Sequence, residues 1–196
     1  MHSFLTAITD IGESAVLGAI TVVSVCYLLA ARCRREAMAL AVSFLLTAFC
    51  MVVMKTVVWG CGTRFYFDTI HSPSGHAALS AAVLGTIAVI MMGRLRGWWR
   101  FVPALILGSL ILLIALTRIW LGFHTPVEVV IGLGIGMAIA GLIYRALIYR
   151  QPVQSFGILQ WMLWMALVMV VLHGIRLPVE IWLHTITSKH ICPVLG

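Results

Sequence analysis

Long apolar stretches follow one another along this chain with only short breaks between them. A transmembrane helix needs roughly 20 mostly apolar residues. About six stretches of that kind are found, at residues 13–31, 37–58, 76–93, 101–117, 126–149 and 158–174. Only 10% of the residues are charged, against about 25% in a soluble domain, so the chain lacks the polar surface of a soluble fold. The sequence therefore predicts an all-α fold, a polytopic membrane bundle of about six transmembrane helices.

No linker, internal repeat or low-complexity segment divides the chain. Each apolar stretch is separated from the next by a connection too short to form a soluble domain of its own. We therefore expect residues 1–196 to form a single membrane-embedded domain.

Basic residues gather on one side of the predicted membrane. Eight of the 13 lie in the connections after the first, third and fifth stretches: Arg32, Arg34, Arg35, Arg94, Arg96, Arg100, Arg145 and Arg150. The other five lie on the opposite side: Lys55, Arg64, Arg118, Arg176 and Lys189. Because cytoplasmic connections carry an excess of Lys and Arg, we expect the opposite side to face the periplasm or the outside of a bacterial inner (plasma) membrane. No basic stripe crosses a polar surface, so a nucleic-acid partner is not expected.

A first group of candidate functional residues lies on the outer side, where the third stretch begins. Residues 71–77 read His-Ser-Pro-Ser-Gly-His-Ala, which predicts a helix start with Ser72 as N-cap and Pro73 in the first turn. Amide groups at such a start bind anions, phosphate above all, and Gly75 allows a close approach. His76, one turn in, could donate a proton. The alternative is an ordinary capped helix with a histidine at the membrane surface.

A second group lies between the fourth and fifth stretches, on the same side. Thr125 and Glu128 have the spacing of a capping box. A functional interpretation, which does not exclude the first, is that the Glu128 carboxylate accepts a ring N–H of His124 and so makes the other ring nitrogen more nucleophilic. Arg118 suits phosphate oxygens because its guanidinium is forked and always charged. The alternative for Arg118 is a side chain that only extends to the membrane surface from a helix end.

Together these two segments resemble the type 2 phosphatidic acid phosphatase superfamily of membrane lipid phosphate phosphatases. Its pattern is K-x6-R-P, then P-S-G-H, then S-R-x5-H-x3-D. Residues 73–76 match the second motif letter for letter. Arg118, His124 and Glu128 match the third in spacing, with Thr117 in place of the serine and glutamate in place of the aspartate.

The first motif matches less closely than the other two. Lys55 stands at its start, but Gly62 occupies the position of the arginine. Arg64 follows two residues later and precedes Phe65 in place of proline. The resemblance covers roughly residues 55–140, which would be the motif-bearing core of the domain.

The resemblance implies a mechanism and a set of site residues. His124 would attack phosphorus and form a phosphohistidine, while His76 would protonate the leaving oxygen and later activate water. Glu128 would orient His124. The phosphate oxygens would be bound by three cations and by N–H groups at the helix start: Lys55, Arg64, Arg118, Ser74 and Gly75. With three cations available, the reaction would require no metal ion and no other cofactor.

The substrate implied is a lipid phosphate or pyrophosphate at the outer leaflet, of the undecaprenyl pyrophosphate, phosphatidic acid or phosphatidylglycerophosphate type. The expected partners are this substrate and the membrane, and an oligomer is possible without being indicated. Two alternatives remain open. One is a non-catalytic relative that binds phospholipids, suggested by the altered first motif. The other is an anion transporter that uses the same charges, although no inverted repeat or broken helix supports it.

Two further features concern packing and capping. Gly132, Gly134, Gly136 and Gly141 line the fifth stretch, and such small residues favour close helix packing, within the bundle or, as the alternative, at a dimer face. Asp10 lies just before the first stretch and Glu13 begins it, where acids stabilise a helix N-terminus. We therefore expect these two acids to have a capping role.

Overall fold

The computed structural model describes residues 9–61, 72–148, 157–172 and 174, and within these ranges every regular element is helical. In chain order the helices are α2 (Ser14–Ala30), α3 (Arg34–Cys61), α4 (Gly75–Met92), the short 3-10 helix η2 (Gly97–Phe101), α5 (Val102–Trp120), α6 (Pro126–Ile148) and α7 (Ile158–Val171). A helical turn at residues 9–11 precedes α2. The predicted all-α class is confirmed.

The helix bounds lie close to the apolar stretches marked in the sequence. Among the described residues, four helical segments are long and apolar enough to cross a membrane: Arg34–Val57, Gly75–Met92, Gly97–Trp120 and Pro126–Leu147. The other two, Ser14–Ala30 and Ile158–Val171, are shorter, at 17 and 14 residues. The structure therefore supports a helical membrane bundle, while the number of six membrane crossings stays a prediction.

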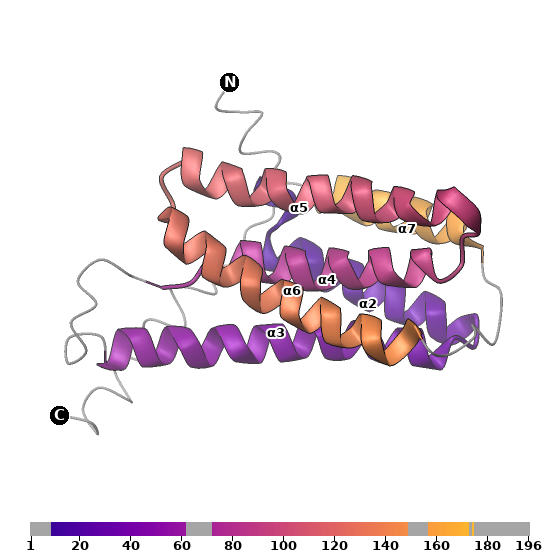
Figure 1. The fold of residues 1–196 in the computed structure, drawn as a ribbon, viewed down its shortest axis with the longest axis horizontal. Helices are drawn as coiled ribbons and strands as arrows, with labels where there is room; N and C mark the ends of the chain where they lie inside the picture. Colours follow the sequence, from indigo (N-terminus) through magenta and orange to yellow (C-terminus); the bar gives the residue numbers. More distant parts are fainter. Residues whose placement is uncertain (1–8, 62–71, 149–156, 173, 175–196) are drawn as a thin grey trace.

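Helix α4 forms the centre of the bundle and contacts α2, α3, α5 and α6 (Figure 1). Of its membrane-length window 72% is buried, against 33% in each of the other three. A helix that is apolar on all sides is suited to such a place. Hydrogen bonds also tie it to α3, because Ser43 Oγ donates to the Ala82 carbonyl and Thr86 Oγ1 donates to Ser43 Oγ, both at 3.0 Å.

Two glycines let α6 approach α4 closely. A Cβ atom added at Gly132 would lie 2.5 Å from the Ser74 carbonyl oxygen, and one added at Gly136 would lie 2.3 Å from that of Ala78. Gly134 and Gly141 have no atom within 4 Å of the added Cβ. The expected packing within the bundle is therefore confirmed for Gly132 and Gly136, and these contacts fix the helix that carries His76 against the one that carries Glu128.

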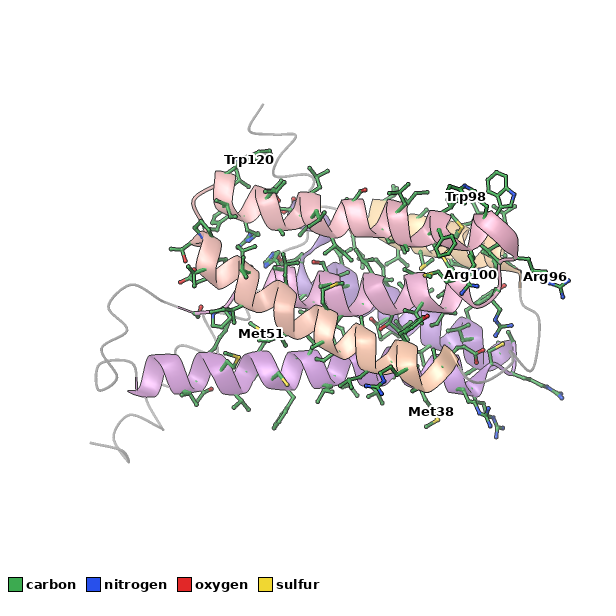
Figure 2. All side chains as sticks on the ribbon, viewed as in Figure 1. Met38, Met51, Arg96, Trp98, Arg100 and Trp120 are labelled. Carbon is green, nitrogen blue, oxygen red and sulfur yellow. The ribbon has the colours of Figure 1, made fainter. Side chains whose placement is uncertain are left out.

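The outer surface of the bundle is apolar, as a lipid environment requires. Large side chains point outward from several helices, among them Leu45 and Phe49 on α3, Leu105 on α5 and Val130 on α6, all more than 60% exposed. Figure 2 shows Arg96, Trp98 and Arg100 together at one end of the bundle. Exposed tryptophans and arginines are typical of a membrane–water interface.

Candidate active site

The turn between α5 and α6 explains the spacing between Arg118 and His124. Gly122 has φ +70°, a left-handed conformation that favours glycine, and it ends α5. The N–H of Phe123 donates to the Arg118 carbonyl at 3.1 Å, and the N–H of Gly122 donates to that of Ile119 at 3.0 Å. This pair of bonds is a Schellman motif. The N–H of His124 also donates to the Arg118 carbonyl, at 3.3 Å, so the turn holds the histidine close to the arginine backbone.

The carboxylate of Glu128 contacts three nitrogen atoms, one from a histidine ring and two from the backbone. Its Oε2 lies 2.9 Å from His124 Nδ1 and accepts the N–H of Thr125 at 3.1 Å. Its Oε1 accepts the N–H of Ser72 at 3.2 Å. The N–H of Glu128 in turn donates to Thr125 Oγ1 at 3.4 Å, which completes a capping box. Glu128 thus caps α6 and holds His124 at the same time, so both of its expected roles have their contacts.

The start of α4 differs from the prediction. Ser74, not Ser72, is the N-cap, and its Oγ accepts the N–H of Ala77 at 3.5 Å. Residues 72–74 precede the helix because α6 holds them there: the N–H of Ser72 donates to the Glu128 carboxylate and that of Ser74 donates to the Glu128 carbonyl at 3.1 Å. These bonds across the site outweigh the local preference for a helix that opens at Pro73.

This shift changes which amides could bind a phosphate. The N–H of Ser74 is engaged by Glu128, so the part that Ser74 plays is to cap the helix. The first amides of an α-helix have no carbonyl partner within the helix. In α4 these belong to Gly75 and His76, and a Cβ added at Gly75 would meet no atom within 4 Å. The open space beside Gly75 fits the expected close approach of a ligand.

Arg118 lies in the last turn of α5 and is 8% exposed. Its guanidinium carbon stands 4.4 Å from the centroid of the Phe123 ring, and its Nη1 donates to Thr9 Oγ1 at 3.4 Å. The side chain is therefore held inside the protein, which does not fit an arginine that only extends to the membrane surface. Since a guanidinium has five N–H donors, these contacts are compatible with a grip on phosphate oxygens.

Of the two cations expected from the first motif, the structure describes only Lys55. Lys55 on α3 is buried, at 6% exposed, and Figure 1 shows the C-terminal end of α3 on the same side of the bundle as the start of α4. Arg64 lies outside the described residues, so its predicted contact with phosphate stays a prediction. Within the described ranges, no three His, Cys, Asp or Glu side chains gather in a way that could hold a metal ion.

Glu13 belongs to the site, although the sequence predicted only a helix-capping role for it. The carboxylate of Glu13 lies 2.6 Å from the Nε2 atom of His76, and both side chains are largely buried. Glu13 occupies the N-cap position of α2, as expected of a capping acid, yet its side chain makes no capping hydrogen bond. No spacing rule links these two residues, since 63 positions separate them. In the sequence, the one feature that could have pointed to Glu13 is that it is one of very few acidic residues and lies at the outer end of an apolar stretch.

Comparison with known proteins gives one match. The family model described as the PAP2 superfamily matches residues 59–152, a range that contains the helix start at 72–76 and the segment from Arg118 to Glu128. No curated protein and no solved structure matches the chain.

Proposed function

We propose that this chain, whose residues 59–152 match the model of the PAP2 superfamily, is a membrane phosphatase of that superfamily that hydrolyses a lipid phosphate or pyrophosphate at the outer leaflet through a phosphohistidine. Members of this superfamily are phosphatases, which supports hydrolysis of a phosphoric ester. The lipid substrate, the intermediate, the leaflet and independence from metal ions are parts of the proposal.

The observation that carries the proposal is the contact between His124 and Glu128. Nδ1 of the ring lies 2.9 Å from a carboxylate oxygen that is itself held by a backbone N–H. A carboxylate on one ring nitrogen fixes the tautomer and leaves the other nitrogen, Nε2, with its lone pair. An imidazole held in this way is suited to nucleophilic attack.

The proposed reaction has two steps. First, His124 Nε2 forms a bond to phosphorus, the bond to the leaving oxygen breaks, and His76 gives that oxygen a proton. Second, a water oxygen bonds to phosphorus, the N–P bond breaks, and the water proton passes to His76. Transfer of a phosphoryl group spreads negative charge over three oxygens, so fixed cations and amides supply most of the stabilisation. The candidates are Lys55, Arg118, Arg64 and the first amides of α4.

The position of the site suggests the class of substrate. Arg118 lies in the last turn of one apolar helix and Glu128 lies in the first turn of the next, so the reacting groups lie at one end of the bundle. A lipid head group at the membrane surface could reach this end while its hydrocarbon tail stays among the lipids. The undecaprenyl pyrophosphate, phosphatidic acid and phosphatidylglycerophosphate types all meet this requirement. The distribution of basic residues favours the periplasmic or outer face of a bacterial inner membrane.

The direct test is phosphate release by the detergent-purified protein, with EDTA present, from a panel of these lipids. Wild type is compared with His124→Ala. Release by wild type that is lost in the variant, with an unchanged unfolding temperature, supports the proposal and ranks the substrates. No release by a folded wild type contradicts it and favours a lipid-binding relative or an anion transporter.

The pH dependence is a second test of the same mechanism. The first step requires one neutral histidine, the nucleophile, and one protonated histidine, the acid. We therefore expect kcat/KM to fall on both sides of an optimum. A flat profile from about pH 5 to pH 9 would count against two histidines with opposite protonation states.

A further inference from the structure

Glu13 and His76 form a contact that has no part in the two reaction steps proposed above. Glu13 Oε2 lies 2.6 Å from His76 Nε2, and Glu13 as a whole is 8% exposed. The partner of the proposed acid is thus a buried carboxylate from a segment 63 positions earlier, outside the range 59–152 that matches the family.

The segment that carries Glu13 is closely fitted to the site. The N–H of Gly12 donates to the Thr9 carbonyl at 3.0 Å, which closes a tight turn. A Cβ added at Gly12 would lie 2.7 Å from Ile114 Cγ2 and 3.6 Å from His76 Cδ2. Glycine is therefore required for the turn to come this close to α4 and α5. The hydrogen bond from Arg118 to Thr9 Oγ1 joins the same turn to the proposed phosphate-binding arginine.

The carboxylate of Glu13 is directed to the ring and not to its own helix. Glu13 has the extended backbone of an N-cap residue, with φ −64° and ψ 140°, but gives α2 no capping hydrogen bond. An acid at a helix start is ordinarily explained by the helix dipole or by capping. Here the short distance to Nε2 gives a more specific explanation.

We propose that Glu13 is a positioning residue for His76: its carboxylate accepts the Nε2 proton and leaves Nδ1 as the nitrogen that exchanges protons with the substrate. This inference rests on the proposed function. When Nδ1 gives its proton to the leaving oxygen, the Nε2 proton stays in the bond to Glu13 and the ring becomes a neutral tautomer of fixed orientation. Nδ1 then carries the lone pair that takes a proton from water in the second step.

The two histidines would then have opposite ring orientations. His124 is held at Nδ1 by Glu128 and would react through Nε2, whereas His76 is held at Nε2 by Glu13 and would transfer protons through Nδ1. Each carboxylate would fix which ring nitrogen carries the proton in the neutral imidazole. The N-terminal turn therefore supplies a part of the catalytic apparatus that the motifs of the superfamily do not include.

The test is Glu13→Gln, measured with two substrates that differ in their leaving group. A lipid monophosphate releases an alkoxide and needs a proton donor, whereas p-nitrophenyl phosphate releases a stable phenolate and needs little help. General acid catalysis contributes about 100-fold to 10,000-fold. We expect the variant to lose about 10-fold to 100-fold in single-turnover rate on the lipid phosphate, and less than about threefold in the first-turnover release of nitrophenol.

Glu36→Gln is the matched control, since it makes the same change in a partly buried ion pair with Arg94. That pair lies where α3 begins and α4 ends, away from the site, so its loss should not depend on the leaving group. Unfolding temperatures of both variants separate a catalytic effect from a folding defect.

Three results would overturn the inference. Equal losses of Glu13→Gln on both substrates would indicate a structural role. A lower KM with unchanged kcat would indicate that the carboxylate occupies the place of the phosphate. Full activity on the lipid phosphate would show that the contact is dispensable. An inactive, folded wild type would instead overturn the proposed function, and this inference with it.

Discussion

Replacing Gly132 by alanine tests whether the close packing of α6 on α4 holds the site together. The added Cβ would lie 2.5 Å from the Ser74 carbonyl oxygen and 3.4 Å from Ala77 Cβ. The obstacle at 2.5 Å is backbone, which cannot rotate away as a flexible side chain can. Since ordinary contact begins at 3.4 Å, the two helices would have to separate locally by about 0.9 Å.

Such a displacement would act directly on the proposed catalytic groups. Ser74 is the N-cap of the helix that carries His76, and its N–H donates to the Glu128 carbonyl at 3.1 Å. If the distance between the Ser74 nitrogen and the Glu128 carbonyl oxygen grew by about 0.9 Å, this hydrogen bond would be lost. A misplacement of catalytic groups by about 1 Å can lower a rate about 100-fold, and overpacking costs about 1–3 kcal/mol of stability. We expect Gly132→Ala to show both losses.

Gly134→Ala, on the same helix, is the control, because a Cβ added at Gly134 would meet no atom of a neighbouring element within 4 Å. Both variants gain the same intrinsic helix propensity, about 1 kcal/mol, so the difference between them isolates the clash. The assays are kcat/KM for phosphate release and thermal unfolding in one detergent. If the two variants prove equally active and equally stable, the packing argument is refuted.

Three other substitutions probe separate contacts. Glu128→Asp should lower kcat/KM about tenfold or more, because the shorter side chain cannot reach His124 and the start of α4 at the same time. This loss is expected although aspartate is the residue of the superfamily pattern. Wild-type activity in steady-state kinetics would contradict it. Arg118→Lys should raise KM about tenfold, since a point charge replaces a forked donor; an unchanged KM would remove the arginine from the phosphate site. Glu36→Gln should lower the unfolding temperature slightly and leave kcat unchanged, because its partner Arg94 lies at the other end of α4, and a loss of activity would show coupling between the two ends.

Much of the architecture could be predicted because it depends on local composition. Apolar stretches of membrane length must form helices, since a bilayer offers no other partner for backbone N–H and C=O groups. The predicted helices accordingly lie within a few residues of those observed. The capping box of Thr125 and Glu128 was also predictable, because its partners are three residues apart and interact whenever the helix forms.

The start of α4 was predicted two residues too early for a reason that lies outside its own segment. Locally, Ser72 and Pro73 favour a helix start. In the folded protein, Glu128 takes the N–H groups of Ser72 and Ser74, and these bonds keep residues 72–74 outside the helix. Similarly, four glycines on α6 share one sequence pattern, but only the packing on α4 shows that Gly132 and Gly136 need to be glycine.

By itself, the sequence determined the all-helical membrane fold, the motif positions and the pairing of His124 with Glu128, because each rests on composition or on residues within a turn or two of one another. Only the tertiary structure decided that Glu13 contacts His76, and that Thr9 contacts Arg118. Both contacts join residues far apart in the chain. They exist because the glycine turn before α2 packs against α4 and α5, an arrangement set by the shapes of whole helices and not by any local pattern.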